Sequence, residues 1–319
     1  MKTFLKNIAA LVLCFIPFAL MPFVAIFWFV DVTATDNMMG ELIHKLDYLA
    51  SLKSPKIVFI GGSGCSHGID SEVVEGAFGI PVANMGLHAG MGLAYQLSSI
   101  DSYVFKGDYI VIIPEYSNFR SCLGGRELLM VISDILPSER TKLDRKQWCN
   151  LLQYMPEYGL NKMKRLLKNT INFCFKKHIT KTDKDYGIYK YNDRGDMIAS
   201  RNDNHNLGFK PAGYQSSEGL LRGNENDCIR RINEFINAHS DATVVMLPAA
   251  FQDASFDNQI SYIDAIEDAL EDNGTPYIAK PLRYRIPNGE CWDTPYHLNA
   301  LGIKRRTDLL VEDLRKIIK

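Results

Sequence analysis

Residues 56–68 of the chain read Lys-Ile-Val-Phe-Ile-Gly-Gly-Ser-Gly-Cys-Ser-His-Gly. The first five form a short apolar run with β-branched side chains, which is typical of a strand buried on both faces of a parallel sheet. The glycines that follow end the strand and begin a tight turn. We therefore expect a buried strand whose carboxyl end opens directly into a glycine-rich loop.

The same pattern recurs along the chain. Further strand-like runs lie at 81–85, 108–114, 243–247 and 276–279, and helical periodicity lies at 37–52, 90–105, 227–238, 257–272 and 300–318. Strands that alternate with helices predict an α/β fold with a parallel sheet covered on both faces. We expect a flavodoxin-like, three-layer doubly wound sheet, whose site lies beyond the carboxyl ends of the strands.

A long segment, about 115–225, interrupts this alternation. Its first part, 148–178, is helical and basic, and its second part, 180–217, has the composition of a loop. A segment of this length without regular structure is unusual inside a compact domain, so we interpret it as a functional insertion or lid. The basic helix suits an anionic membrane surface or a partner protein, but a solvated face packed on its own domain is the commoner case.

An apolar run from Ile8 to Val30 follows Lys2 and Lys6. About 20 apolar residues cross a bilayer as a helix, so this run predicts a membrane anchor. Because the lysines precede it, we expect a cytoplasmic N-terminus and a single-pass protein. The predicted organisation is therefore an anchor over 1–35 and an extracytoplasmic domain over 36–319. The alternative is a signal peptide cleaved near residues 32–34. The apolar core of a signal peptide is usually shorter than the run in this chain, so we favour the anchor.

Composition excludes some partners and leaves others open. The 319 residues carry a formal net charge of -1, which gives no reason to expect nucleic acid binding. Seven cysteines are present, and the six outside the apolar run permit disulfides in an oxidising compartment without fixing any pairing. No Cys/His cluster has zinc-ligand spacing, so no metal is expected.

Chemistry-bearing residues gather at the predicted strand ends. They lie at 61–68, at 84–90 and, ahead of the last helix, at 293–299. Ser63 is the candidate nucleophile, with Ser66 as the alternative, and His297 is the candidate base that would take the serine proton. Asp293 is close enough in sequence to hold the imidazole, and backbone N–H groups near Ser63 and Gly86 are candidate oxyanion donors.

A nucleotide-binding interpretation of the same glycine loop fails. Gly68 lies one position too late for the dinucleotide fingerprint, and Asn84 stands where an acidic residue would end the second strand. The lysine of a phosphate-binding P-loop is also missing. No cofactor is therefore expected.

Together these blocks resemble the SGNH (GDSL-type) hydrolase family from about residue 56 to the C-terminus, apart from the insertion. The resemblance places Ser63 as the nucleophile, Gly86 as the glycine of the second block, and Asp293 and His297 as the carboxylate and base. Two positions depart from the family pattern. Asp293 and His297 are four residues apart instead of three, and Glu115 stands where the family has an oxyanion asparagine. Asn118 is a possible substitute for that asparagine. His88, in the block after the second strand, is expected at the same opening of the site, beyond the carboxyl ends of the strands.

The resemblance is closest to membrane-anchored proteins that acylate envelope polymers, such as the D-alanyl transfer protein of teichoic acids and the alginate O-acetylation proteins. It implies transfer or removal of an acyl group on an envelope or exported polysaccharide through an acyl-Ser63 intermediate, beside a membrane-bound O-acyltransferase. Two alternatives remain open. One is a catalytically weak scaffold that binds glycan or the acyltransferase, and the other is an esterase that acts alone.

Overall fold

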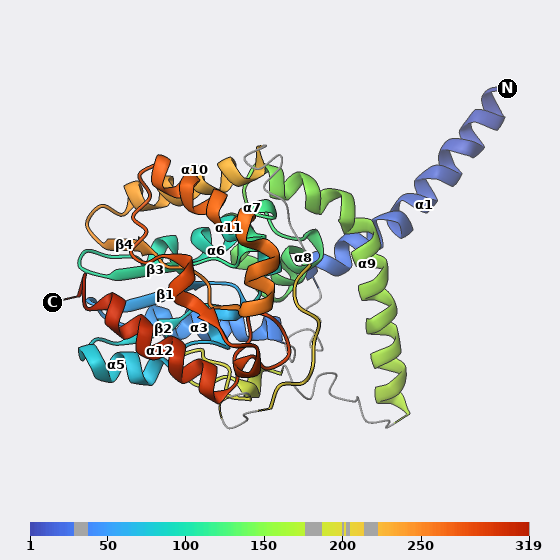
Figure 1. Ribbon diagram of the computed structural model, residues 1–319. Helices are drawn as coiled ribbons and strands as arrows, with labels where there is room; N and C mark the ends of the chain where they lie inside the picture. Colours follow the sequence, from blue (N-terminus) through green and yellow to red (C-terminus); the bar gives the residue numbers. More distant parts are fainter. Residues whose placement is uncertain (29–37, 176–186, 200, 202–204, 214–222, 319) are drawn as a thin grey trace.

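The computed structural model describes residues 1–28, 38–175, 187–199, 201, 205–213 and 223–318. The chain forms an α/β domain from which one N-terminal helix projects, with the two termini at opposite ends of the molecule (Figure 1). The helices are α1 (Lys2–Trp28), α3 (Glu41–Ser51), α4 (Ser63–Ser66), α5 (Ser71–Phe78), α6 (Leu93–Ile100), α7 (Tyr116–Arg120), α8 (Arg126–Ile135), α9 (Arg145–Cys174), α10 (Asn224–Ala238), α11 (Asp253–Asp272) and α12 (Ala300–Leu314).

The main sheet confirms four of the five predicted strands. They are β1 (Ile57–Gly61), β2 (Val82–Asn84), β3 (Tyr109–Ile113) and β4 (Thr243–Met246), all parallel, in the order β2-β1-β3-β4. That order is the one found in flavodoxin-like doubly wound sheets. The predicted strand at 276–279 is reduced to a single parallel bridge between Tyr277 and Met246 beside β4.

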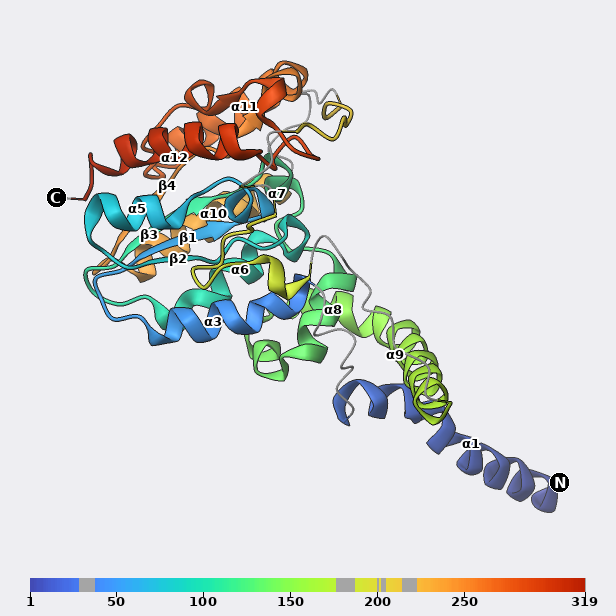
Figure 2. The same ribbon diagram turned by 90° about the horizontal axis from the view of Figure 1, so that it is seen from below.

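Side chains of successive strand residues enter different layers, as the two-residue period of a strand requires. Val58 and Ile60 pack in the larger apolar cluster with side chains of α3, α6 and α10. Ile57 and Phe59 pack on the other face, in a cluster that includes side chains of α5 and α12. The sheet is therefore buried between two helical layers, with α5 and α12 on one side and α3 and α6 on the other (Figure 2).

A second, two-stranded sheet was not predicted. It pairs β5 (Phe251–Gln252) with β6 (Arg285–Ile286) in parallel. Two residues are too few to show a periodic pattern in the sequence. Its position matters because Gln252 N donates to Pro295 O at 3.0 Å, which ties it to the segment that carries Asp293 and His297.

The insertion contains more helix than its sequence suggested. The predicted helix at 148–178 corresponds to α9, which begins at a capping box made by Asp144 and Gln147. The shorter helix α8 was missed. The predicted loop at 180–217 lies partly outside the described residues.

The described part of that loop covers the edge of the sheet at β2. Arg194 O accepts from Asn84 N at 2.8 Å, as a neighbouring strand would. The buried amine of Lys45 donates to Asn84 O at 2.7 Å and to Gly195 O. Burial lowers the pKa of Lys45 to about 8. The insertion is thus part of the core and not only a cover over it.

Helix α1 projects from the domain and packs beside α9. Its segment Lys2–Met21 is long and apolar enough to cross a membrane, and none of its residues is buried inside the domain. Such a helix is typical of a single-pass anchor and of a signal sequence. The predicted end of the apolar run at Val30, the cleavage alternative at 32–34 and the domain boundary at 35/36 lie outside the described residues.

All seven cysteines are free thiols. Cys65, Cys122, Cys228 and Cys291 are buried, and Cys14, Cys149 and Cys174 are exposed. The disulfides that the even cysteine count permitted are therefore not formed in this structure.

Candidate active site

The turn after β1 places Ser63 at the carboxyl end of the central strand, as predicted. Ser63 is the first residue of α4, and the two glycines before it allow a close approach to β3. A Cβ at Gly61 would lie 2.1 Å from Ile113 O, and one at Gly62 would lie 2.4 Å from Glu115 Oε1. Only glycine fits at Gly61, where the clash is with backbone, and a side chain at Gly62 would displace the Glu115 carboxylate.

Glu115 is the direct partner of Ser63. Its Oε1 atom accepts hydrogen bonds from Ser63 Oγ at 3.2 Å and from Gly64 N at 3.0 Å. Only 6% of Glu115 is exposed. A carboxylate oxygen therefore accepts from both the candidate nucleophile and the backbone N–H of the next residue. A backbone N–H beside a nucleophile is a donor of the kind that stabilises the oxyanion of a tetrahedral intermediate.

Asn118 holds Glu115 in place. Its Oδ1 atom accepts from Glu115 N at 3.0 Å, which closes a capping box at the start of α7. Its Nδ2 atom donates to Ala89 O at 2.8 Å and so links the ends of β3 and β2. Both ends of the Asn118 amide are engaged in these contacts. They give Asn118 a positioning role in place of the predicted role as an oxyanion donor.

Gly86 also differs from its predicted role. Its N–H donates to Asn84 Oδ1 at 3.1 Å and not toward Ser63. A Cβ at Gly86 would lie 2.3 Å from Cys65 Cβ and 2.8 Å from Gly62 O. The glycine is therefore needed so that the loop after β2 can pack against the turn that carries Ser63.

Asp293 and His297 form the predicted pair. Asp293 Oδ1 lies 2.7 Å from His297 Nδ1, and only 7% of His297 is exposed. The four-residue spacing is accommodated because this segment is a turn closed by Trp292 N, which donates to His297 O at 2.8 Å. Thr294 Oγ1 accepts from the backbone N–H of His297 at 3.1 Å and tightens the same turn.

His67 joins the two halves of the site. Its ring is fully buried and lies flat on His297, with 3.8 Å between ring centroids and 6° between planes. Burial, and then the positive charge of His297, hold the pKa of His67 well below its usual value. A neutral His67 can support the ring of His297, and it does not repel that ring when His297 takes up a proton. The sequence did not identify this contact of His67.

Backbone contacts reinforce this junction. Leu298 N donates to His67 O at 3.3 Å, and a Cβ at Gly64 would lie 3.4 Å from Tyr296 Cβ. Tyr296 also accepts through its hydroxyl from Tyr116 N at 3.2 Å. The segments that begin after β1, after β3 and before α12 therefore meet at one place. Within it, Ser63 is directed to Glu115 and His297 to Asp293.

His88 lies in the same mouth. Its Nδ1 atom accepts from Gly90 N at 2.9 Å. Burial lowers its pKa, the negative charge of Glu115 acts in the opposite direction, and the charge of His297 lowers it further. The His88 ring is thus close enough to interact electrostatically with both Glu115 and His297, and it is neutral near pH 7.

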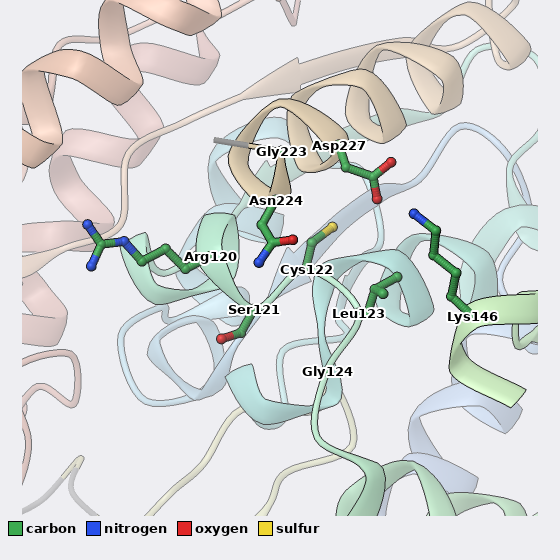
Figure 3. Close-up of a pocket in the computed structure, with 9 residues that line it drawn as sticks. All are labelled: Arg120, Ser121, Cys122, Leu123, Gly124, Lys146, Gly223, Asn224 and Asp227. Carbon is green, nitrogen blue, oxygen red and sulfur yellow. The ribbon is translucent and has the colours of Figure 1, made fainter. Parts of the chain in front are cut away.

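A cavity of about 420 Å³ lies away from these residues, between the segment after α7 and the start of α10 (Figure 3). Its lining includes two positively charged side chains, Arg120 and Lys146, and one negatively charged side chain, Asp227. Ser63, Asp293 and His297 do not line it. Mixed charges of this kind favour no particular class of ligand.

No family model, no curated protein and no solved structure matches this chain. The case for a function therefore depends on the residues of the site itself.

Proposed function

We propose that the chain is a serine-dependent acyl-transfer enzyme of the SGNH type. The observation that carries the proposal is the hydrogen-bonded pair of Asp293 and His297, packed through His67 against the turn that presents Ser63. A base oriented by a carboxylate beside a serine on a post-strand turn is the set of groups that nucleophilic acyl transfer needs.

In the proposed reaction, Ser63 Oγ attacks the carbonyl carbon of an acyl ester while His297 takes the hydroxyl proton. Asp293 occupies Nδ1, so the serine proton is assigned to Nε2. The tetrahedral intermediate collapses to acyl-Ser63 when the C–O bond to the leaving alcohol breaks and His297 returns the proton to that alcohol. A sugar hydroxyl or water then attacks acyl-Ser63, with His297 again as the base.

Glu115 defines the resting state in this scheme. It holds the Ser63 hydroxyl and the Gly64 N–H, which are the groups that a substrate carbonyl needs. The substrate carbonyl oxygen must displace this carboxylate oxygen before Gly64 N–H can stabilise the developing negative charge. Glu115 therefore limits reaction with water or small esters when the proper substrate is absent.

The setting favours transfer near a membrane. Helix α1 supports a single anchor, and the lysines at its start favour a cytoplasmic N-terminus with the domain outside. We assign the acceptor to an envelope or exported polysaccharide, and the acyl donor to a membrane-bound O-acyltransferase partner. These assignments rest on the family resemblance and on the proposed anchor.

Labelling with a serine-reactive fluorophosphonate tests the chemistry. Ser63→Ala should abolish labelling, and His297→Ala should slow it by about 10²–10⁴-fold, the usual contribution of a general base. Ser66→Ala serves as the matched control and should label normally, because the hydroxyl of Ser66 donates to Ser63 O and is not the nucleophile. Glu115→Gln should label faster, since it keeps the shape of the side chain and removes its charge.

A catalytically weak scaffold that binds glycan or the acyltransferase is the second candidate. The predicted oxyanion donors, Gly86 N–H and the Asn118 amide, already donate to other atoms of the protein. This favours a scaffold, because donors engaged in this way do not stabilise an oxyanion. This second candidate predicts that the folded protein does not label at Ser63, with or without Glu115→Gln. Labelling that survives Ser63→Ala would contradict the assignment of the nucleophile.

A further inference from the structure

Helix α9 is held to the domain by one side of its first half. Its buried residues include Leu151, Met155, Tyr158 and Lys162, which recur at three- and four-residue intervals. Tyr158 Oη donates to Asp134 Oδ2 at 2.7 Å, and the buried amine of Lys162 pairs with the same carboxylate. From residue 163 to the end of the helix every residue is half-buried or exposed. The second half of α9 therefore extends beyond its attachment.

A second apolar row lies on another side of α9. Leu152, Leu160, Leu167 and Ile171 expose 57%, 51%, 63% and 47% of their surface. Their spacing brings them to one side of a helix with 3.6 residues per turn. Four large aliphatic side chains aligned in this way are more than the scattered exposed residues of an ordinary surface. The row indicates an apolar environment that the domain itself does not supply.

In the part of α9 after Glu157, the charges beside this row are positive. After Glu157 the helix contains Lys162, Lys164, Arg165 and Lys168 and no acidic residue. Lys164 and Lys168 are exposed, lie one turn apart and flank the row. An apolar stripe bordered by lysines is typical of helices that lie in the interface of an anionic bilayer, because the apolar side chains enter the lipid while the amines meet phosphate groups.

The position of α9 suits the same environment. The candidate membrane span α1 packs beside it, and the two helices are neighbours in both views (Figures 1 and 2). With α1 in a membrane, α9 is the part of the domain carried next to the lipid surface. The exposed fractions of the apolar row already include the contact with α1, so α1 does not cover it.

We infer that α9 is a membrane-surface helix, whose apolar row enters an anionic bilayer while Lys164 and Lys168 contact lipid phosphates. The inference requires that α1 spans the membrane, and it is independent of the acyl-transfer chemistry. It adds a second attachment to the single anchor and so fixes which side of the domain faces the lipid.

The test uses the full chain in nanodiscs that hold one copy each. Cys14, Cys149 and Cys174, the exposed cysteines, are first replaced by serine. A fluorophore is then placed at Leu167→Cys or, as the matched control, at Leu282→Cys, because the two leucines expose 63% and 65% of their surface. Lipids with a nitroxide on the acyl chain report whether each fluorophore reaches the bilayer.

In phosphatidylglycerol nanodiscs we expect several-fold stronger quenching at position 167 than at 282. The pair Lys164→Gln and Lys168→Gln should reduce quenching at 167, as should replacing phosphatidylglycerol by phosphatidylcholine. The charge-matched pair Lys53→Gln and Lys106→Gln, ahead of β1 and β3, should not. Equal quenching at 167 and 282 would overturn the inference. So would protection of position 167 that appears only with two copies per disc or with an added protein, because the row would then be a protein interface.

Discussion

At the scale of single residues, His67 is subject to two constraints at once. Its ring is fully buried, and it lies flat on the candidate base His297. The first constraint makes His67 costly to protonate, and the second makes its shape important for the position of His297. These two effects can be separated, because phenylalanine keeps a flat ring and has no proton to gain.

We predict that His67→Phe makes stability less dependent on pH. The pKa of His67 is lowered in the folded protein, so below about pH 6.5 the unfolded chain takes up a proton that the native state does not. Acid therefore favours unfolding through this residue. The melting temperature of the parent should fall more between about pH 7 and about pH 5 than that of His67→Phe.

His67→Ala gives the complementary control, because it removes the titrating group together with the ring. Fluorophosphonate labelling should slow in His67→Ala and persist in His67→Phe. An equal pH dependence in the parent and in His67→Phe would show that the ring of His67 is protonated in the native state.

Residue pairs differ in how far the sequence could predict them. The contact of Asp293 with His297 was predictable, because four residues of a turn cannot separate two side chains by much. The contact of Glu115 with Ser63 required the register of β1 and β3, which pairs Gly61 with Ile113. The stacking of His67 on His297 depends on the path of the whole 291–298 turn, and no local pattern encodes it.

At the scale of elements, the loop after β2 and the turn after β1 are packed without room for a side chain between them. Gly86 lies at this contact. Gly76, on the exposed side of α5, has no atom within 4 Å of the position of a Cβ. The two glycines therefore allow the same substitution to be made with opposite consequences.

We predict that Gly86→Ala lowers the free energy of unfolding by about 1–3 kcal/mol or more, the usual result of overpacking a core. Gly76→Ala should raise it by about 0.5–1 kcal/mol, because alanine loses less conformational freedom than glycine inside a helix. Denaturant titration of both variants measures the difference. A Gly86→Ala protein as stable as the parent would mean that the two loops can move apart.

Elements differ in predictability for a related reason. The strands of the main sheet are buried on both faces, so each appears in the sequence as an uninterrupted apolar run. The fifth run, at 276–279, contains Pro276, which has no N–H to donate, and only Tyr277 pairs with β4. The strand-like contact of Arg194 with Asn84 was not predictable, because it lies in a polar segment and depends on the buried amine of Lys45.

At the scale of the whole molecule, the apolar core and the candidate anchor are separate. The three apolar clusters of the described chain begin at Met39 or later, whereas no residue of the span within α1 is buried. The candidate membrane span was predictable because a run of about 20 apolar residues matches the thickness of a bilayer. The contact between α1 and α9 was not predictable, since no pattern in the sequence of either helix indicates that the two helices pack together.

We predict that a chain starting at Met38 folds to a domain of nearly unchanged stability. The free energy of unfolding should stay within about 1 kcal/mol of the full-length value, because the buried apolar clusters of the described chain are built from Met39 onward. Denaturant titrations of both proteins in the same detergent provide the comparison. Loss of cooperative unfolding in the shorter chain would show that α1 is an integral part of the domain.

The carboxylate of Glu115 has a consequence for turnover under the proposed chemistry. A hydrolytic side reaction would release a free acid, whose anion seeks the same two donors that Glu115 already holds. The released acid would have to compete with the Glu115 carboxylate for these donors, so it would bind weakly and dissociate quickly. Under the proposed chemistry, the released acid would therefore be a weak inhibitor, and its accumulation would not slow the next cycle.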